Sequence, residues 1–207
     1  MENNSSKEHW EQVYETKTPE QVSWTQEVPQ TSLDLIHSFN LQKSARIIDV
    51  GGGDSKLVDY LLEEGFEHIS VLDISEKALE KAKKRLGAKA ASVTWIVSDI
   101  TAFDPVEVYD VWHDRAAFHF LTSPEQVEKY VDIARKSVSG YLAIATFSEN
   151  GPKKCSGLDI RQYSEESLRT LLQNDFEKLS CITEDHTTPF DTTQNFLFCS
   201  FRKRKPV

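Results

Sequence analysis

Cysteine is scarce in this sequence, and this scarcity limits the kinds of site that the chain can build. The three cysteines, Cys155, Cys181 and Cys199, are odd in number and contain no C-x-x-C spacing. Such a set argues against a disulfide framework and against a zinc site. We therefore expect free thiols, a cytoplasmic location and no bound metal.

Positive charge is in deficit as well, with 24 Lys and Arg against 33 Asp and Glu and a net charge of −9. An acidic chain does not bind nucleic acid through general electrostatics, so no nucleic-acid partner is expected. The basic run Arg202–Lys205 is interpreted as a solvated tail. No apolar stretch approaches the roughly 18 residues of a membrane helix, and the first residues contain no apolar signal core, so we expect no membrane partner. The sequence also contains no P-loop motif G-x-x-x-x-G-K-[ST].

The sequence does contain a glycine turn, at residues 45–62. An apolar strand, Ile47–Val50, is followed by Gly51–Gly53, after which apolar residues return with helical spacing. Asp54 is a suitable N-cap for this helix, and Gly65 is a suitable left-handed residue at its end. A strand, a tight turn and a helix in this order present free backbone N–H groups to a ligand that approaches closely.

The residues around the turn discriminate between ligands. Gly51 and Gly53 fit the dinucleotide fingerprint G-x-G-x-x-G/A, but its last position is Lys56, whose long side chain opposes close packing of helix on strand. Asp49, just before the turn, repels a pyrophosphate and attracts a cation or an ammonium group. An NAD-dependent oxidoreductase is therefore only the alternative interpretation.

The segment Asp49–Ser55 resembles the first motif of class I S-adenosylmethionine-dependent methyltransferases, acid-x-Gly-x-Gly-x-Gly, with Ser55 in place of the last glycine. The segment Tyr109–Leu121 resembles the fourth motif, and its Trp-His-Asp-Arg is similar to an uncharacterised bacterial branch, with a weaker likeness to thiopurine and thiol methyltransferases. The resemblance implies an α/β fold with a Rossmann-like seven-stranded sheet, helices on both faces and an antiparallel last strand. It also implies S-adenosyl-L-methionine as the cofactor and methyl transfer as the activity.

The order of the predicted elements agrees with this fold. Strands and helices alternate and finish in two consecutive strands, Phe176–Glu184 and Asn195–Arg202, which an ordinary dinucleotide fold lacks. We divide the chain into an N-terminal aromatic lid and helix, residues 1–40, and a methyltransferase domain, residues 41–207.

Two further acids follow predicted strands. Ser75 is the better N-cap for the next helix, which leaves Asp73 for the two hydroxyls of a ribose, although a capping or loop role is the alternative. Asp99 occupies the position that, by the resemblance, binds the exocyclic amine of adenine, unless it is a plain loop residue. Ile74 and Ile100 are then placed to sandwich the adenine, and otherwise belong to the core. With Asp49, Gly51 and Gly53, these residues form the predicted cofactor site.

The segment 109–121 is the richest in reactive side chains. A strand that ends near His113 brings this residue, Asp114 and Arg115 into the crevice at the carboxyl ends of the strands. We assign His113 to the cofactor site and Trp112 to the core. Methyl transfer needs a base only when the acceptor is protonated, and Asp114 and His119 are the candidates; His119 is equally suited to orient a loop.

Aromatic residues stand out in the polar segment 7–30, namely Trp10, Tyr14 and Trp24. We interpret Tyr14 and Trp24 as part of a lid over the cofactor, because aromatic faces stack on purines and attract cations such as a sulfonium. The alternative is that the rings cap the apolar edge of the main domain.

The loop around Cys155 carries two lysines that would lower the thiol pKa and make it reactive, against a plain turn as the alternative. The acceptor is expected to be a small molecule, because no basic groove is evident, with a protein side chain as second choice. A non-catalytic cofactor sensor or scaffold is the remaining function, and the oligomeric state has no signature in the sequence.

Overall fold

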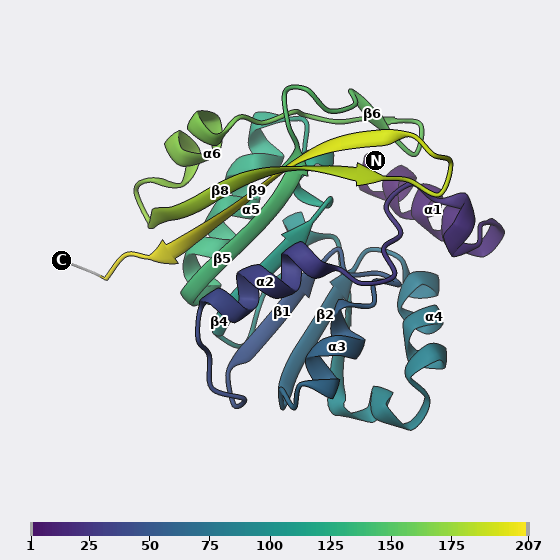
Figure 1. Cartoon of the computed structure of the whole chain (residues 1–207), viewed down its shortest axis with the longest axis horizontal. Coiled ribbons are helices and arrows are strands. Elements are labelled where there is room, and N and C mark those ends of the chain that lie inside the picture. Colours follow the sequence, from purple (N-terminus) through teal and green to yellow (C-terminus); the bar gives the residue numbers. More distant parts are fainter. Residues whose placement is uncertain (1, 206–207) are drawn as a thin grey trace.

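The structure is a computed structural model that describes residues 2–205, with side chains described from residue 6 onward. Seven strands form one twisted sheet in the order β3-β2-β1-β4-β5-β9-β8 (Figure 1). All neighbouring pairs are parallel except those that include β9, which runs antiparallel to both β5 and β8. The predicted fold, including the antiparallel last strand, is confirmed. The strands are β1 Arg46–Val50, β2 His68–Asp73, β3 Val93–Val97, β4 Tyr109–Arg115, β5 Val138–Phe147, β8 Phe176–Thr187 and β9 Thr193–Lys203.

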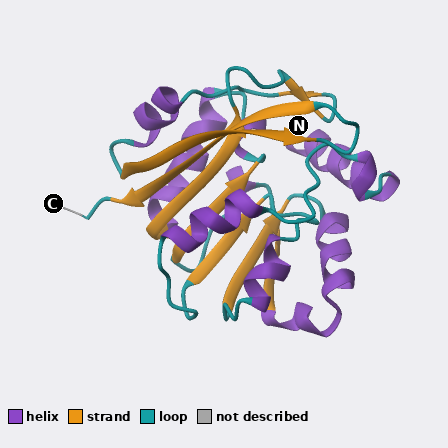
Figure 2. Cartoon of the chain, viewed as in Figure 1, coloured by secondary structure: helices purple, strands orange, loops and turns teal. Residues whose placement is uncertain are grey.

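Helices cover both faces of the sheet, as the alternation of elements predicts (Figure 2). Apolar side chains of α2, α3 and α4 pack on one face in a cluster that contains Ile47 and Val71, whereas α5 and α6 pack on the other with Ile48 and Trp112. Figure 1 shows α2 and α3 in front of the sheet and α5 behind it. The α-helices are α1 Glu2–Thr16, α2 Gln30–Ser38, α3 Leu57–Glu63, α4 Glu76–Leu86, α5 Pro124–Ser137 and α6 Glu165–Leu172; the 3-10 turns are η1 Pro19–Gln21, η2 Gly87–Ser92, η3 Ile100–Ala102 and η4 Phe118–Phe120. A small hairpin, β6 Lys154–Cys155 and β7 Leu158–Asp159, follows β5.

Local capping signals place most helix ends. The hydroxyl of Ser75 accepts the N–H of Ala78 at the start of α4, and Ser123 forms a capping box at the start of α5. Gly65 has a φ of +86° directly after α3, as a left-handed helix end requires. The predicted Asp54 cap is wrong, because α3 begins only at Leu57 and Asp54 is drawn away into an ion pair with Arg85.

The expectation of free thiols is wrong for two cysteines. Cys181 and Cys199 form a disulfide between β8 and β9, where they are register partners with Cα atoms 4.1 Å apart. Residues this distant in sequence face each other only once the hairpin register has formed, so spacing alone does not reveal the pair. The cysteine count consequently no longer supports a reducing compartment, and the cytoplasmic location stays a prediction.

The basic C-terminal run is not a free tail over residues 202–204. Strand β9 continues to Lys203, and Arg202 forms an ion pair with Glu177. Arg204 donates from Nε to the carbonyl of Gln173, 2.9 Å away. Pairing of β9 with β8 therefore includes Arg202 and Lys203, which the basic composition suggested to be part of a solvated tail. Within residues 2–205 no helix has the length and apolar character that crossing a membrane requires.

Candidate active site

A cavity of about 990 Å³ lies at the carboxyl ends of the parallel strands. Strands β1 and β4 are neighbours in the sheet although β2 and β3 come between them in sequence, so the chain direction of the crossovers reverses here. Open α/β sheets bind ligands at such a point. The volume of this cavity is at the upper end of the range for small-molecule sites. The predicted site residues that line it are Tyr14, Trp24, Asp49, Gly51, Asp73, Ile74, Asp99, Ile100 and His113.

The glycine turn lines the cavity through Gly51 and Gly52, whereas Gly53 is not among the described lining residues. Gly51 and Gly53 have φ values of +66° and +47°, a region that side chains strongly disfavour. A Cβ on Gly51 would overlap that of Ala117, and one on Gly53 would lie 2.7 Å from the Tyr14 hydroxyl and 3.0 Å from Asp73 Oδ2. Three segments that line the cavity thus approach the turn closely: α1, the end of β2 and the loop after β4.

Asp73 ends β2 beside this turn and is buried. Its Oδ1 accepts the N–H of Ser75 at 2.8 Å. Burial, assisted by the charges of Asp49 and Glu11, raises the pKa of Asp73 to about 7. The group therefore changes its charge near neutral pH.

Asp99 comes after β3, at the neighbouring position along the edge of the sheet. Its Oδ1 accepts from both the N–H and the hydroxyl of Thr101, each at 2.7 Å, and so caps η3. Asp99 therefore caps a 3-10 turn through Oδ1, and the residue also lines the cavity together with Ile74 and Ile100.

Asp49 and His113 are register partners on β1 and β4, and both are buried. His113 Nδ1 lies 2.7 Å from Asp49 Oδ1, and its Nε2 lies 2.9 Å from the Ser32 hydroxyl of α2. Because both ring nitrogens are engaged, the imidazole is fixed and holds the carboxylate of Asp49 in one orientation. The role of Ser32 has no signal in the local sequence.

An N-terminal lid, defined as α1 together with residues 17–29, covers the cavity. Trp10, Tyr14 and Trp24 contact one another, with ring centroids 5.6 Å apart for Trp10 and Trp24. Trp10 also packs edge-on against Phe120 after β4, at 5.1 Å. The aromatic residues of the segment thus line the cavity, and Trp24 also packs against the main core, so a lid over the cofactor stays a prediction.

A carboxylate anchors α1 to the helix start beside Asp73. Glu11 accepts the backbone N–H groups of Glu76 and Lys77 at 2.8 and 3.1 Å and the hydroxyl of Ser75 at 3.1 Å. A carboxylate is favourable at a helix N-terminus, where backbone N–H groups lack partners. No sequence signal links Glu11 to a helix that begins 65 residues later.

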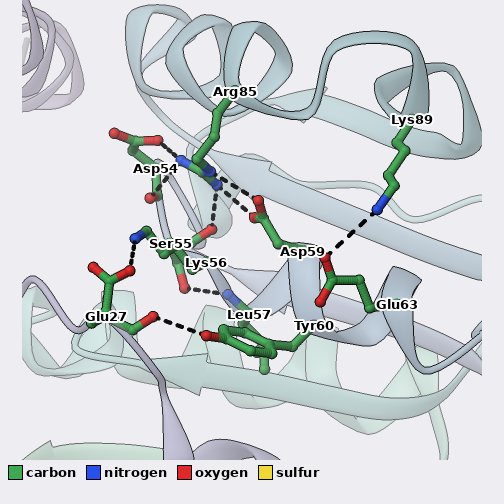
Figure 3. Close-up of polar contacts among 10 residues, drawn as sticks. All are labelled: Glu27, Asp54, Ser55, Lys56, Leu57, Asp59, Tyr60, Glu63, Arg85 and Lys89. Atoms are coloured by element: carbon green, nitrogen blue, oxygen red, sulfur yellow. Dashed lines mark hydrogen bonds and ion pairs between the residues drawn. The ribbon is translucent and has the colours of Figure 1, made fainter.

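Arg85 of α4 connects the loop after the glycine turn to α3 (Figure 3). Its guanidinium forms an ion pair with Asp54 and donates to the carbonyls of Asp54 and Ser55 at 3.1 and 2.8 Å. It also binds both carboxylate oxygens of Asp59, at 3.0 and 2.8 Å. Arg85 therefore holds the loop and the first turn of α3 in a fixed relation.

A model of the methyltransferase domain family matches residues 47–140. This range runs from β1 to the first residues of β5 and contains Asp49, Asp73 and Asp99. This match supports the predicted assignment of the chain to the class I S-adenosylmethionine-dependent methyltransferases. The predicted family is confirmed.

Among curated proteins, this chain is 31% identical over 105 residues to malonyl-[acyl-carrier protein] O-methyltransferase of Anoxybacillus flavithermus, covering 50% of this chain and 39% of the relative. It is 24% identical over 127 residues to the eEF1A lysine and N-terminal methyltransferase of Mus musculus, covering 59% and 18%. The chain thus spans less than half of the length of either relative.

Solved structures share the fold over nearly the whole chain. A methyltransferase from Anabaena variabilis superposes with a TM-score of 0.77 at 16% identity, covering 99% of this chain and 96% of the other. The N-methyltransferase NodS of Bradyrhizobium japonicum, solved with S-adenosylhomocysteine, gives 0.72 at 15% identity, covering 94% and 98%. At these identities the likeness concerns the fold.

The two predicted bases are not among the described residues that line the cavity. Asp114 is fully buried, accepts the N–H groups of Ala117 and Phe118 and the hydroxyl of Tyr130, and so caps η4. Burial raises the pKa of Asp114 to about 6. This carboxylate positions the loop that packs against Gly51.

His119 is also fully buried. Its Nδ1 accepts the N–H of Phe147 at 3.3 Å, and the ring stacks on that of Phe147. Burial lowers the pKa of His119 to about 3, with the charge of Arg115 adding to the effect. The imidazole is therefore neutral and orients a loop, which was the alternative for this residue.

The reactive-thiol interpretation of Cys155 is wrong. The thiol is buried, and burial raises its pKa to about 11 instead of lowering it. Lys154 turns outward and pairs with Asp159 across the β6–β7 hairpin, so it does not stabilise a thiolate. Cys155 belongs to β6 of the small hairpin and lines the cavity.

Proposed function

We propose that this methyltransferase transfers the methyl group of S-adenosylmethionine to a small-molecule acceptor that is enclosed in the cavity. The observation that supports this proposal is the lining of a single cavity. Carboxylates at the ends of β1, β2 and β3 line it together with aromatic residues of the lid and the loop after β4. S-adenosylmethionine, when bound, supplies a methyl group on a sulfonium, whose leaving group is neutral.

The carboxylates at the ends of β1, β2 and β3 fit the hydrogen-bond donors of this cofactor. Asp73 would accept the ribose hydroxyls through Oδ2, because Oδ1 already accepts from Ser75. Asp99 would accept the exocyclic amine of adenine, with Ile74 and Ile100 against the ring. Asp49, oriented by His113, would attract the methionyl ammonium beside Gly51 and Gly53.

Tyr14 and Trp24 would cover the bound cofactor from the lid. Their rings exclude water from the site and present aromatic faces to a cation. In this proposal the cover consists of α1 and residues 17–29. Helix α2 does not belong to it, although the predicted boundary lies at residue 40, because Leu33 and Ile36 of α2 pack in the main core.

Positioning would supply most of the acceleration. With Asp114 and His119 inside the fold, neither reaches a substrate without rearrangement of η4. Holding the acceptor in contact with the methyl group is worth several orders of magnitude in rate without a protein base. An acceptor that carries no proton on its reacting atom at neutral pH suits such a site.

The two matched relatives differ in the acceptor that their names give. One matched relative bears the name of an acyl-carrier-protein O-methyltransferase and the other that of a lysine and N-terminal methyltransferase. The lid over the cavity favours a small molecule, because a protein side chain would have to pass α1 and residues 17–29. A protein acceptor is the second candidate.

Thermal unfolding with S-adenosylmethionine, S-adenosylhomocysteine and NAD in parallel tests the cofactor site. A ligand at about 100 times its Kd adds roughly 2.7 kcal/mol to the free energy of unfolding. We expect stabilisation by the two sulfur compounds but not by NAD, and its loss in Asp73→Asn. Stabilisation by NAD alone would indicate an oxidoreductase.

Transfer of a radioactive methyl group in cell extract distinguishes the acceptors. After separation by size, the label is expected in the small-molecule fraction, and label in protein would indicate the second candidate. Cofactor binding with no transfer to either fraction would favour a non-catalytic sensor.

A further inference from the structure

Arg115 is the last residue of β4 and lines the cavity. Its Nη1 donates to the carbonyl of Trp24 in the lid, 3.0 Å away. Its Nε and Nη2 are buried from solvent and have no hydrogen-bond partner among the described residues. One edge of a guanidinium is thus left without an acceptor in a site that water barely reaches.

The surroundings do not compensate for this edge. One flat face of the guanidinium lies 4.9 Å from the centroid of the Phe196 ring, which accounts for the face but not for the N–H groups. Glu184 and Asp49 are the carboxylates that act on its charge, but Glu184 accepts from Thr31 and Asp49 is bonded to His113. Buried donors without acceptors are costly, so such groups in native proteins usually await a partner.

The free edge has a specific geometry. Nε–H and Nη2–H point in the same direction from the planar guanidinium and are spaced like the two oxygens of a carboxylate. Nη1, on the other edge, is already used by the lid. An ammonium has no acceptor for either donor, and a hydroxyl offers a single oxygen for the two, whereas a carboxylate offers one oxygen to each.

We propose that Arg115 binds a carboxylate of a molecule in the cavity, so that the acceptor belongs to the class of small carboxylic acids. This inference rests on the proposed methyl transfer. The shared chemistry is a carboxylate, and the other source of it is the methionyl end of the cofactor.

The position of Arg115 favours the acceptor as the source. Two of its neighbours, Phe196 of β9 and Cys155 of β6, lie outside the residues 47–140 that match the family model and outside the proposed cofactor site, whereas Asp49 and Trp24 belong to that site. The proposed contacts to the ribose and the adenine lie at the ends of β2 and β3. Since the chain carries a net charge of −9, an anionic acceptor requires a specific cation to be held at all.

The first experiment measures the affinity of S-adenosylmethionine and of decarboxylated S-adenosylmethionine for the wild type, Arg115→Met and Arg115→Lys. If the acceptor is the source, each variant binds both compounds as the wild type does. A wild-type preference for the carboxylated compound that disappears in Arg115→Met would assign the carboxylate to the cofactor.

The second experiment titrates protein saturated with S-adenosylhomocysteine with benzoate, phenylacetate and succinate and with their amides, followed by the fluorescence of the lid tryptophans. We expect an acid, but not its amide, to bind the wild type and to lose about ten- to a hundredfold in affinity in both variants. Arg161→Met, which removes an exposed arginine, is the matched control and should bind as the wild type does.

The proposal is overturned if the folded variants match the wild type in both experiments. A wild type that binds neither sulfur compound would instead reject the proposed function. Arg115→Lys keeps the charge but not the two parallel donors, so it tests the fork even if Arg115→Met folds poorly.

Discussion

A buried carboxyl group at a strand end responds to pH near neutrality, and Asp73 is such a group. Ribose hydroxyls donate to the ionised form, so ligand binding lowers its pKa and releases a proton. With a pKa of about 7 in the free protein, the affinity for S-adenosylhomocysteine should rise with pH by several-fold between pH 6 and 8 and level off above. Calorimetric titration across this range measures the effect, and Asp73→Asn should bind weakly with no such rise.

The raised pKa of Asp73 also makes the stability of the ligand-free protein depend on pH. The folded state holds a proton on Asp73 that the unfolded chain has lost, so the free energy of unfolding should fall as pH rises from about 4 to about 7. Asp114 acts in the same direction up to about pH 6. A slope that is as steep in Asp73→Asn as in the wild type would contradict the assignment for Asp73.

At the scale of single residues, sequence reasoning found the acids of the cavity but misjudged the residues behind them. Asp49, Asp73 and Asp99 lie in or within two residues of the carboxyl ends of strands, so their location at the edge of the sheet is a local property. The burial of Asp114 and His119 depends on Tyr130 and Phe147, which come from other elements.

At the scale of elements, Arg85 links α4 to the loop and α3, and its removal should loosen the loop after the glycine turn (Figure 3). In Arg85→Met the carboxylates of Asp54 and Asp59 lose their shared partner. We expect a loss of about 1–3 kcal/mol in the free energy of unfolding and weaker binding of S-adenosylhomocysteine. Denaturant unfolding and calorimetry measure the two effects.

The neighbouring Lys89 supplies the control. It pairs with Glu63 at 3.6 Å, with both side chains about 60% exposed, and such pairs contribute little. Lys89→Met should therefore leave both quantities nearly unchanged. Equal behaviour of the two variants would show that the Arg85 contacts do not matter for the loop.

The docking of α1 is a second property of an element. Glu11 joins α1 to the first turn of α4, so Glu11→Ala should free the lid and increase the dissociation rate of S-adenosylhomocysteine by about five- to tenfold, the effect of a lost charge-assisted bond. Stopped-flow tryptophan fluorescence measures this rate.

Glu15, one turn later, makes only a half-exposed pair with Lys77 and serves as the matched control. Glu15→Ala should dissociate the ligand at the wild-type rate. If Glu11→Ala does so too, α1 is not held by its carboxylate.

At the scale of the whole molecule, the disulfide between Cys181 and Cys199 joins the two strands at one edge of the sheet, away from the cavity. Cys181→Ala should lower the free energy of unfolding by up to about 3 kcal/mol through loop closure, with no change in affinity for S-adenosylhomocysteine. Urea unfolding with and without reductant measures the contribution. A wild type that is insensitive to reductant would refute a role of the bond in stability.

The sequence by itself determined the alternation of strands and helices, the glycine turn and the acids at the ends of β1, β2 and β3. These features depend on neighbours within a few residues: apolar spacing, caps and turn residues act locally. The closing antiparallel pair also follows from order along the chain, because two strands without a helix between them form a hairpin.

Only the tertiary structure decided which side chains meet. The Cys181–Cys199 pair depends on strand register, the Glu11 and Arg85 contacts join helices far apart in sequence, and the free edge of Arg115 results from what β9, β6 and the lid leave around it. Each of these outcomes is set by packing between distant segments, and so is the burial that moves the pKa of Asp73 and Asp114. Local sequence carries no information on such distances, so these contacts and the free edge of Arg115 can be recognised only in the folded chain.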